Sequence, residues 1–227
     1  MDVRAFLSER LASVRGRIAD ACRRAGRSPD SVTLVAVTKT VSPAVAAVAL
    51  DLGMTDLGEN RPQELWKKSA ALHAARFHLI GHLQRNKIDR TVPLTHLVHS
   101  VDSERLLDAL DAFGRSRNRA VPILLEVNCS REASKGGLSP DALLALSDKA
   151  LSLTGVSVRG LMTMAAYHDD PELCRPAFAE LRRLRDRLGL AELSMGMSND
   201  FEVAIEEGAT LVRVGTTLFE GLANGPA

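Results

Sequence analysis

The lysine at position 39 is the residue whose type and place in this chain best suit covalent chemistry. It ends a β-prone run, Val32-Thr-Leu-Val-Ala-Val-Thr-Lys39, after which Ser42-Pro43 begins an Ala/Val-rich helical stretch. An ammonium that follows seven largely apolar residues is expected to be partly desolvated, which disfavours its charged form and frees the nucleophilic amine. The position therefore predicts an amine that condenses with an aldehyde. A lysine that snorkels at a strand end is the alternative interpretation.

A second group of candidate residues lies late in the chain and suits a phosphate. In the segment 194–202, Ser198 or Asn199 can cap a new helix, and Glu202 can complete a capping box. Free backbone N–H groups at such a helix start, together with the Ser198 hydroxyl, predict an anion site. An ordinary helix cap without a ligand is the alternative.

The next segment, 212–217, adds three further candidates, Arg213, Gly215 and Thr216. Gly215 permits a close backbone approach, and Thr216 supplies a hydroxyl donor. Arg213 can donate to a ring nitrogen or a phosphate, although a structural salt bridge would also explain it. Asn60, at the end of an earlier predicted strand, can donate to a phenolic oxygen or satisfy a turn.

Histidines and arginines elsewhere in the chain do not predict a metal or nucleic-acid site. The pairs His78/His82 and His96/His99 have suggestive spacing, but the helical His-Glu-x-x-His pattern is missing, so we predict no metal. The arginine-rich stretch 181–187 has leucines at helical spacing, which makes its charges the solvated face of an outer helix. No aromatic residues interleave with that charge, and we therefore predict no nucleic-acid partner.

The composition describes a globular protein of a reducing compartment. The chain has 227 residues, 45% of them hydrophobic, and a formal net charge of +1, so no overall field favours nucleic acid or membranes. Cys22, Cys129 and Cys174 are odd in number and widely spaced, which argues against a disulfide framework. The residues 1–10 are interrupted by charges, and no apolar run reaches transmembrane length. We expect a cytoplasmic protein.

The pattern of apolar residues indicates strands alternating with helices after one long N-terminal helix, at about residues 2–26. Eight strand-like runs favour a single (β/α)8 TIM barrel, at about 31–222, within one domain covering 1–227. An open doubly wound sheet is the alternative, but no Gly-x-Gly-x-x-Gly follows the first strand. The predicted strands are Val32–Thr40, Thr55–Gly58, Phe77–Gly81, His96–Val101, Val121–Asn128, Val156–Met164, Glu192–Met197 and Leu211–Leu218.

Several short motifs in this order resemble the pyridoxal phosphate homeostasis protein family. The resemblance covers nearly the whole chain and implies a fold-type III pyridoxal-phosphate barrel, similar to the barrel domain of alanine racemase, without the C-terminal β domain of that enzyme. The motifs that carry it are Ala36-Val-Thr-Lys39-Thr, Gly58-Glu-Asn60, His78-Leu-Ile-Gly-His-Leu-Gln84, Ser134-Lys-Gly-Gly137, Gly160-Leu-Met162, Gly196-Met-Ser198 and Val212-Arg213-x-Gly215-Thr216.

The resemblance also implies a cofactor and a role for each candidate residue. Pyridoxal 5′-phosphate would form a Schiff base with Lys39, with Arg213 near its pyridine nitrogen and Asn60 beside its ring. Ser198, Gly215 and Thr216 would hold its phosphate. No catalytic residue is established by the resemblance.

The expected activity is that of a carrier. Two cations in contact repel, so an arginine at the pyridine nitrogen disfavours protonation and makes the ring a weaker electron sink. We expect a monomer in vitamin B6 homeostasis, with pyridoxal-phosphate-dependent client enzymes as partners. A low-activity amino-acid racemase is one alternative, although the tyrosine Tyr167 has no evident route to the cofactor. A barrel lyase that forms an imine with a sugar phosphate is the other.

Overall fold

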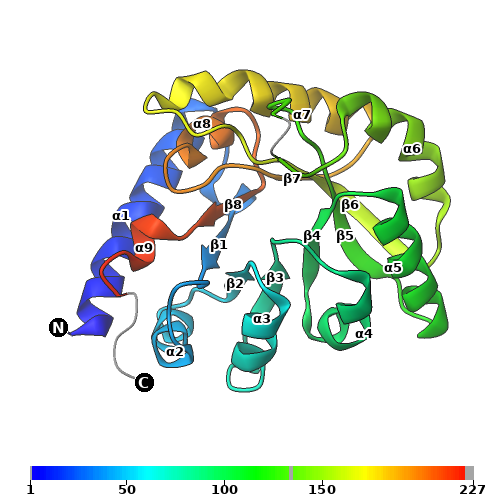
Figure 1. Ribbon diagram of the computed structural model, residues 1–227. Helices are drawn as coiled ribbons and strands as arrows, with labels where there is room; N and C mark the ends of the chain where they lie inside the picture. Colours follow the sequence, from blue (N-terminus) through cyan, green and yellow to red (C-terminus); the bar gives the residue numbers. More distant parts are fainter. Residues whose placement is uncertain (1, 133–134, 223–227) are drawn as a thin grey trace.

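A closed barrel of parallel strands forms the centre of the molecule. The computed structural model describes residues 2–132 and 135–222. Within these residues, eight strands follow one another around the barrel in chain order, and the first pairs with the last (Figure 1). The strands are β1 (Thr33–Val37), β2 (Asp56–Glu59), β3 (Arg76–Leu79), β4 (Leu97–Val101), β5 (Val121–Glu126), β6 (Val156–Met162), β7 (Glu192–Ser194) and β8 (Leu211–Val214).

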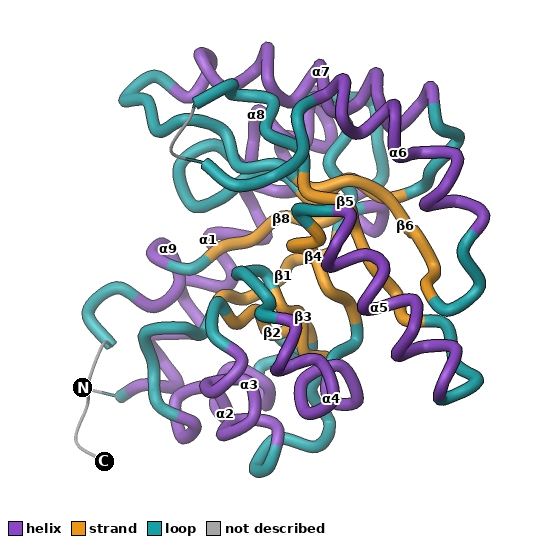
Figure 2. Tube along the Cα trace, turned by 45° about the vertical axis from the view of Figure 1, so that its right-hand side comes forward, coloured by secondary structure: helices purple, strands orange, loops and turns teal. Residues whose placement is uncertain are grey.

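Helices connect successive strands and cover the outside of the barrel, as the ring of helices around the strands in Figure 2 shows. This is the arrangement that parallel strands require, because each crossover must return to the same end of the sheet. The helices are α1 (Val3–Arg24), α2 (Pro43–Asp51), α3 (Pro62–Ser69), α4 (Ile88–Thr91), α5 (Glu104–Ser116), α6 (Pro140–Ser152), α7 (Arg175–Arg187), α8 (Phe201–Glu206) and α9 (Thr216–Phe219).

Helix α1 precedes the alternating strands and helices and packs against α2, α8 and α9 on the outside of the barrel. Its N-terminus is capped by the Asp2 carboxylate, which accepts hydrogen bonds from the N–H groups of Arg4 and Ala5. Its buried stripe, Leu7, Leu11, Val14, Ile18, Ala21 and Cys22, has helical spacing. The helix lies beside α8 and α9 (Figure 1), so it braces the two loops in which we predicted a phosphate site.

The apolar core has two parts that differ in size. The larger part lies between the helices and the outer face of the strands. The smaller lies inside the barrel and consists of Val35, Leu97, Leu124, Met162 and Leu211, with Met164 packed against it. The rest of the lumen holds polar side chains, among them His78, His99 and Arg213.

The predicted fold is confirmed, and the strand ends are the main correction. All eight strands occur, but most end earlier than predicted, and the run Leu211–Leu218 is divided into β8 and the short helix α9. The β1 run ends at Val37, where its pairing with β2 stops, and a turn follows in which the Val41 N–H donates to Thr38 O. Hydrophobic content alone does not mark this point.

The helices and the cysteines can be compared with the expectations from composition. In the described part of the chain, no helix has the length and apolar character that crossing a bilayer requires. The thiols of Cys22, Cys129 and Cys174 are free and buried. Ser134 of the predicted motif, and residues 1 and 223–227 of the predicted domain, lie outside the described residues.

Candidate functional site

Lys39 lies at the carboxyl-terminal end of the barrel, two residues beyond β1 and not on the strand itself. The prediction of partial desolvation is wrong, because the turn that begins at Thr38 carries the Lys39 side chain into an exposed position. The backbone of this turn is nevertheless held: the Thr38 N–H donates to Gly58 O at 3.0 Å. The amine is therefore accessible to an incoming aldehyde, on a fixed backbone.

A buried ion pair that the sequence analysis missed lies directly beneath this turn. Lys68 Nζ donates to Glu59 Oε1 and to the carbonyl oxygen of Thr38, each at 2.5 Å, and the Thr38 hydroxyl also donates to Glu59. Both charged side chains are fully buried. Burial raises the pKa of the Glu59 carboxyl, against the attraction of Lys68. The sequence contains a signal for this burial, because Lys68 follows Pro62 and Leu65 at three-residue steps on the buried face of α3.

The loops after β7 and β8 are joined through one hydroxyl. Ser198 Oγ accepts hydrogen bonds from the backbone N–H groups of Gly215 and Thr217, both at 3.2 Å. Among the described residues, the Ser198 hydroxyl hydrogen has no acceptor, and the N–H groups of Ser198, Asn199 and Thr216 have none either. These free donors belong to two facing loops and suit an anion with several oxygens.

The predicted capping role of this segment is wrong. Helix α8 begins at Phe201 with Asp200 as its N-cap, and Ser198 bonds the neighbouring loop instead. Asp200 Oδ1 accepts the N–H of Met197, which closes the turn. Glu202 bonds Arg17 of α1 at 2.7 Å and leaves the loop donors free.

Two glycines allow the backbone to adopt this shape. Gly196 has φ = +91°, and a Cβ there would lie 2.6 Å from that of Ala204, so a side chain is excluded by both backbone conformation and space. Gly215 lies against β1: a Cβ would lie 3.3 Å from that of Val37. Close packing at Gly215 brings the β8 loop alongside the end of β1, the strand that precedes Lys39.

Arg213 is the buried cation of the site. It is 3% exposed on β8 and donates to Ser194 Oγ at 2.6 Å and to the carbonyl oxygen of Thr163 at 2.8 Å. Burial lowers the pKa of the Arg213 guanidinium to about 10, so it is charged at neutral pH. Among the described residues it makes no salt bridge, which removes the structural alternative. Two of its five N–H groups are used, and three remain for a ligand.

Two further side chains lie at the same end of the barrel. Asn60 follows β2, and the pairing of Val37 with Gly58 places it beside Lys39, as predicted from the rim order. The sequence analysis gave no role to Glu126, which ends β5 and is 7% exposed. Burial, with Asp102 nearby, raises the pKa of the Glu126 carboxyl to about 7. A buried carboxyl in a cleft whose pKa is raised this far is a candidate functional group.

The histidines that the sequence paired by spacing are paired differently in space. His78 Nδ1 lies 2.8 Å from His99 Nε2 inside the barrel, whereas His82 is exposed and bonds Asp102. Within the described residues, no cluster of three or more side chains could hold a metal ion.

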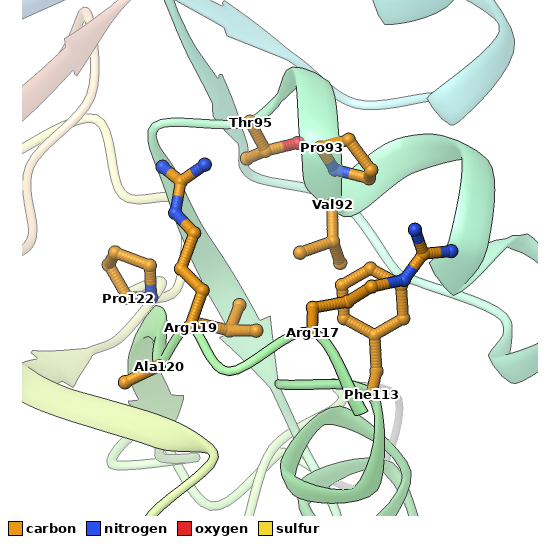
Figure 3. Close-up of a pocket in the computed structure, with 9 residues that line it drawn as sticks. Val92, Pro93, Thr95, Phe113, Arg117, Arg119, Ala120 and Pro122 are labelled. Atoms are coloured by element: carbon orange, nitrogen blue, oxygen red, sulfur yellow. The ribbon is translucent and has the colours of Figure 1, made fainter. Parts of the chain in front are cut away.

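A cavity of about 200 Å³ lies at the opposite end of the barrel, where β5 begins. Figure 3 shows it between the side chains of Arg119 and Arg117, the latter beside the Phe113 ring. Pro93 and Pro122 also line it. None of the predicted site residues takes part, so we do not associate this cavity with the Lys39 chemistry.

Comparison with known proteins identifies related chains along almost the full length. The family described as alanine racemase, N-terminal domain, matches residues 10–222. A pyridoxal phosphate homeostasis protein of Aquifex aeolicus is 45% identical over 219 residues, covering 93% of this chain and 96% of that protein.

Solved structures show the same fold. PipY of Synechococcus elongatus, with pyridoxal phosphate bound, is 35% identical, has a TM-score of 0.82 and covers 94% of this chain and 99% of its own. An alanine racemase from Bartonella henselae with covalently bound pyridoxal phosphate has a TM-score of 0.79 at 15% identity, covering 100% of this chain and 62% of that one. The second likeness concerns the fold alone.

Proposed function

The chain belongs to the family of pyridoxal phosphate homeostasis proteins, and we propose that it holds pyridoxal 5′-phosphate on Lys39 as an intracellular carrier. The observation that carries this proposal is the arrangement at one end of the barrel. This end of the barrel holds an accessible lysine and a buried arginine, and among the described residues no carboxylate contacts that arginine. It also holds a set of N–H donors that have no acceptor within the described residues. A relative at 35% identity binds this cofactor.

In this proposal Lys39 makes the covalent link. Its neutral amine attacks the aldehyde carbon, a C=N bond forms and water leaves. The exposed position of the side chain allows the aldehyde to reach it. The Thr38 carbonyl, held by Lys68, fixes the backbone from which the side chain extends.

The phosphate fits the two facing loops. The free N–H groups of Ser198 and Thr216 and the Ser198 hydroxyl supply donors, and Gly215 leaves room for the group to approach the backbone. A dianionic phosphate also offers enough acceptor oxygens to satisfy all of these donors at once. The residues present therefore fit the cofactor.

Arg213 and Asn60 would face the cofactor ring. When bound, the cofactor supplies an electron-withdrawing ring that can stabilise a carbanion. A guanidinium that donates to the pyridine nitrogen disfavours protonation of that nitrogen and weakens the effect. Burial lowers the pKa of Arg213, but the value of about 10 leaves the guanidinium charged at neutral pH. The site therefore favours holding the cofactor over catalysis with it.

The second candidate, a low-activity amino-acid racemase, would use the same binding residues. It needs proton donors and acceptors on both faces of the substrate α-carbon. Tyr167 is 78% exposed, and among the described residues at this end of the barrel, Glu126 is the buried carboxyl with a pKa near 7. Exchange of the α-proton of amino acids with solvent, lost in Lys39→Ala, would favour this candidate over the carrier.

We further propose a cytoplasmic monomer that passes the cofactor to client enzymes that depend on it. Three buried free thiols fit a reducing compartment. The exposed side chain of Lys39 is compatible with transfer of the cofactor to a client enzyme, because the active site of that enzyme can reach the linkage.

The experiment identifies which lysine carries the cofactor. The purified protein is mixed with pyridoxal phosphate, its visible spectrum is recorded, and the protein is then reduced with borohydride and mapped by mass spectrometry. We expect a yellow protein with the label on Lys39, no label in Lys39→Ala and an unchanged label in Lys67→Ala, an exposed lysine of α3. A colourless protein, or a label on Lys87 or Lys135 instead, overturns the proposal.

A further inference from the structure

A chain of hydrogen bonds crosses the inside of the barrel from Arg213 to the opposite end. Arg213 Nη1 lies 2.6 Å from Ser194 Oγ, which lies 2.8 Å from His99 Nδ1. His99 Nε2 lies 2.8 Å from His78 Nδ1, and His78 Nε2 lies 3.0 Å from Asp56 Oδ1. All five side chains are buried. They come from β8, β7, β4, β3 and β2, so the chain connects strands on several sides of the lumen.

With a neutral imidazole at His78, the two ends of this chain of hydrogen bonds set the direction of its protons. A guanidinium only donates and a carboxylate only accepts. Asp56 therefore requires a hydrogen on His78 Nε2, which in a neutral imidazole leaves Nδ1 as an acceptor. His99 must then carry its hydrogen on Nε2 and accept at Nδ1 from the Ser194 hydroxyl, whose oxygen accepts from Arg213. Every donor in the chain points from Arg213 toward Asp56.

Burial keeps His99 neutral. It holds the pKa of His99 well below its usual value, and the cationic Arg213 acts in the same direction. Asp200 and Glu126 are the carboxyl groups that act on Arg213 from the rim.

At the other end, Asp56 is an ionised carboxylate. Burial opposes its ionisation, but hydrogen bonds from His78 and Arg76 outweigh it and hold the pKa of Asp56 well below its usual range. Arg76 is the partner of Asp56 on the solvent side, and Arg159 and His96 also face this end.

We propose that Ser194, His99, His78 and Asp56 are positioning residues for Arg213, which together hold its guanidinium charged and aimed at the pyridine nitrogen of the bound cofactor. The role in cofactor binding rests on the proposed function; the chain of hydrogen bonds does not. Asp56 serves as the counterion of Arg213 through the hydrogen bonds of the intervening side chains. A carboxylate in direct contact with Arg213 would occupy N–H groups that the ligand needs. The chain of hydrogen bonds from Arg213 to Asp56, which we call the relay, leaves these N–H groups free.

Packing alone does not explain this use of the lumen. A neighbouring part of the same interior is filled by Val35, Leu97, Leu124, Met162 and Leu211, so apolar side chains fit there. Burying polar groups is favourable only if each finds its partner. Here each of the five does, and the one buried cation of the lumen among the described residues is at the end of the chain.

The first test examines the protein without cofactor. Histidine side chains labelled with ¹⁵N are assigned by NMR at neutral pH, using His78→Gln and His99→Gln for assignment. We expect a hydrogen on Nε2 and none on Nδ1 in both His78 and His99. A hydrogen on Nδ1 of either ring overturns the proposal, because it reverses part of this chain of hydrogen bonds.

The second test uses the cofactor-loaded protein. We expect His99→Phe and Ser194→Ala to weaken cofactor binding about tenfold and to raise the pH at which the cofactor absorption titrates by about one unit. His99→Gln retains an acceptor and a donor, so it should restore most of the binding and most of the titration behaviour. His73 is exposed and takes no part in the hydrogen-bonded series, so His73→Phe should change neither the binding nor the titration.

The two tests separate this inference from the proposed function. If folded His99→Phe and Ser194→Ala titrate like the unmodified protein, the positioning role is wrong although the cofactor still binds Lys39. If the unmodified protein does not bind the cofactor, the proposed function is wrong, and with it the role toward the pyridine nitrogen. The NMR tautomers then still decide whether the chain of hydrogen bonds exists.

Discussion

Two buried cations of this protein are neutralised in different ways. Lys68 lies outside the barrel, beneath the Lys39 turn, and contacts the carboxylate of Glu59 directly at 2.5 Å. Arg213 lies inside the barrel and reaches the carboxylate of Asp56 only through three intervening side chains. Both cations are almost completely shielded from water. They differ in what they leave available: Lys68 is fully used by the protein, whereas Arg213 retains donors for a ligand.

The direct ion pair and the relay serve different purposes in the fold. Glu59 and Lys68 are nine residues apart, so their pair joins β2 to α3 and fixes one loop. The Arg213 relay joins residues 157 positions apart and depends on five strands at once. A direct pair gives local rigidity, and a relay makes one charge depend on the assembly of the whole barrel.

The largest effect is expected from breaking the direct pair. Lys68→Met leaves the Glu59 carboxylate buried without its cation, which should lower the free energy of unfolding by about 3–5 kcal/mol at pH 7. Burial already raises the pKa of Glu59, and losing Lys68 raises it further. The carboxyl can then escape the penalty by binding a proton, so the loss should grow as the pH rises. Denaturant unfolding at pH 5 and pH 8 measures both effects.

Matched variants separate the charge from the packing. Lys67→Met removes the adjacent exposed lysine and should change the free energy of unfolding by less than about 0.5 kcal/mol. The double variant Glu59→Gln/Lys68→Met should recover most of the stability lost by Lys68→Met alone, because no buried charge is left unpaired. A loss below about 1 kcal/mol in Lys68→Met would show that the pair contributes little.

Breaking the relay at its acidic end should have a smaller effect. Asp56→Asn keeps an acceptor for His78 but removes the charge, which should lower the free energy of unfolding by about 1.5–3 kcal/mol at pH 7. Because the pKa of Asp56 is lower in the folded protein, its stabilisation is present above the unfolded value, about 3.9, and is lost as the pH falls further. The difference between Asp56→Asn and the unmodified protein should therefore shrink below about pH 4.

The control for this prediction is a carboxylate at the surface. Asp51, whose side chain is 65% exposed, lies 3.6 Å from Arg4, and Asp51→Asn should leave the acid limb of the stability curve unchanged. Equal curves for Asp56→Asn and the unmodified protein at every pH would mean that Asp56 is not the counterion of Arg213.

The two networks also show what the sequence could predict. The period of apolar runs was sufficient for the barrel, because strands buried on both faces alternate with helices. The resemblance named Lys39, Ser198 and Arg213, which lie at one end of the barrel as expected. Exposure of Lys39 was not predictable, since it depends on where pairing between β1 and β2 stops.

The relay was beyond prediction for a geometric reason. His78 and His99 are hydrogen-bonded because β3 and β4 are neighbours and both side chains point into the lumen. Sequence spacing suggested His78 with His82, but His78 is buried whereas His82 is exposed and bonds Asp102. The stagger of neighbouring strands decides which inward side chains lie in contact. This stagger cannot be read from the residue pattern of a single strand.

The smallest effect tests whether the relay or the surface holds Asp56. Arg76 contacts both carboxylate oxygens of Asp56, but its side chain is 53% exposed, so the attraction is screened by water. Arg76→Gln should therefore lower the free energy of unfolding by less than about 1 kcal/mol and leave the NMR tautomers of His78 and His99 unchanged. If it instead destabilises as much as Asp56→Asn, Asp56 is held mainly by Arg76, and the carboxylate is not the counterion of Arg213. A small loss with intact tautomers leaves the buried histidines as the partners that matter.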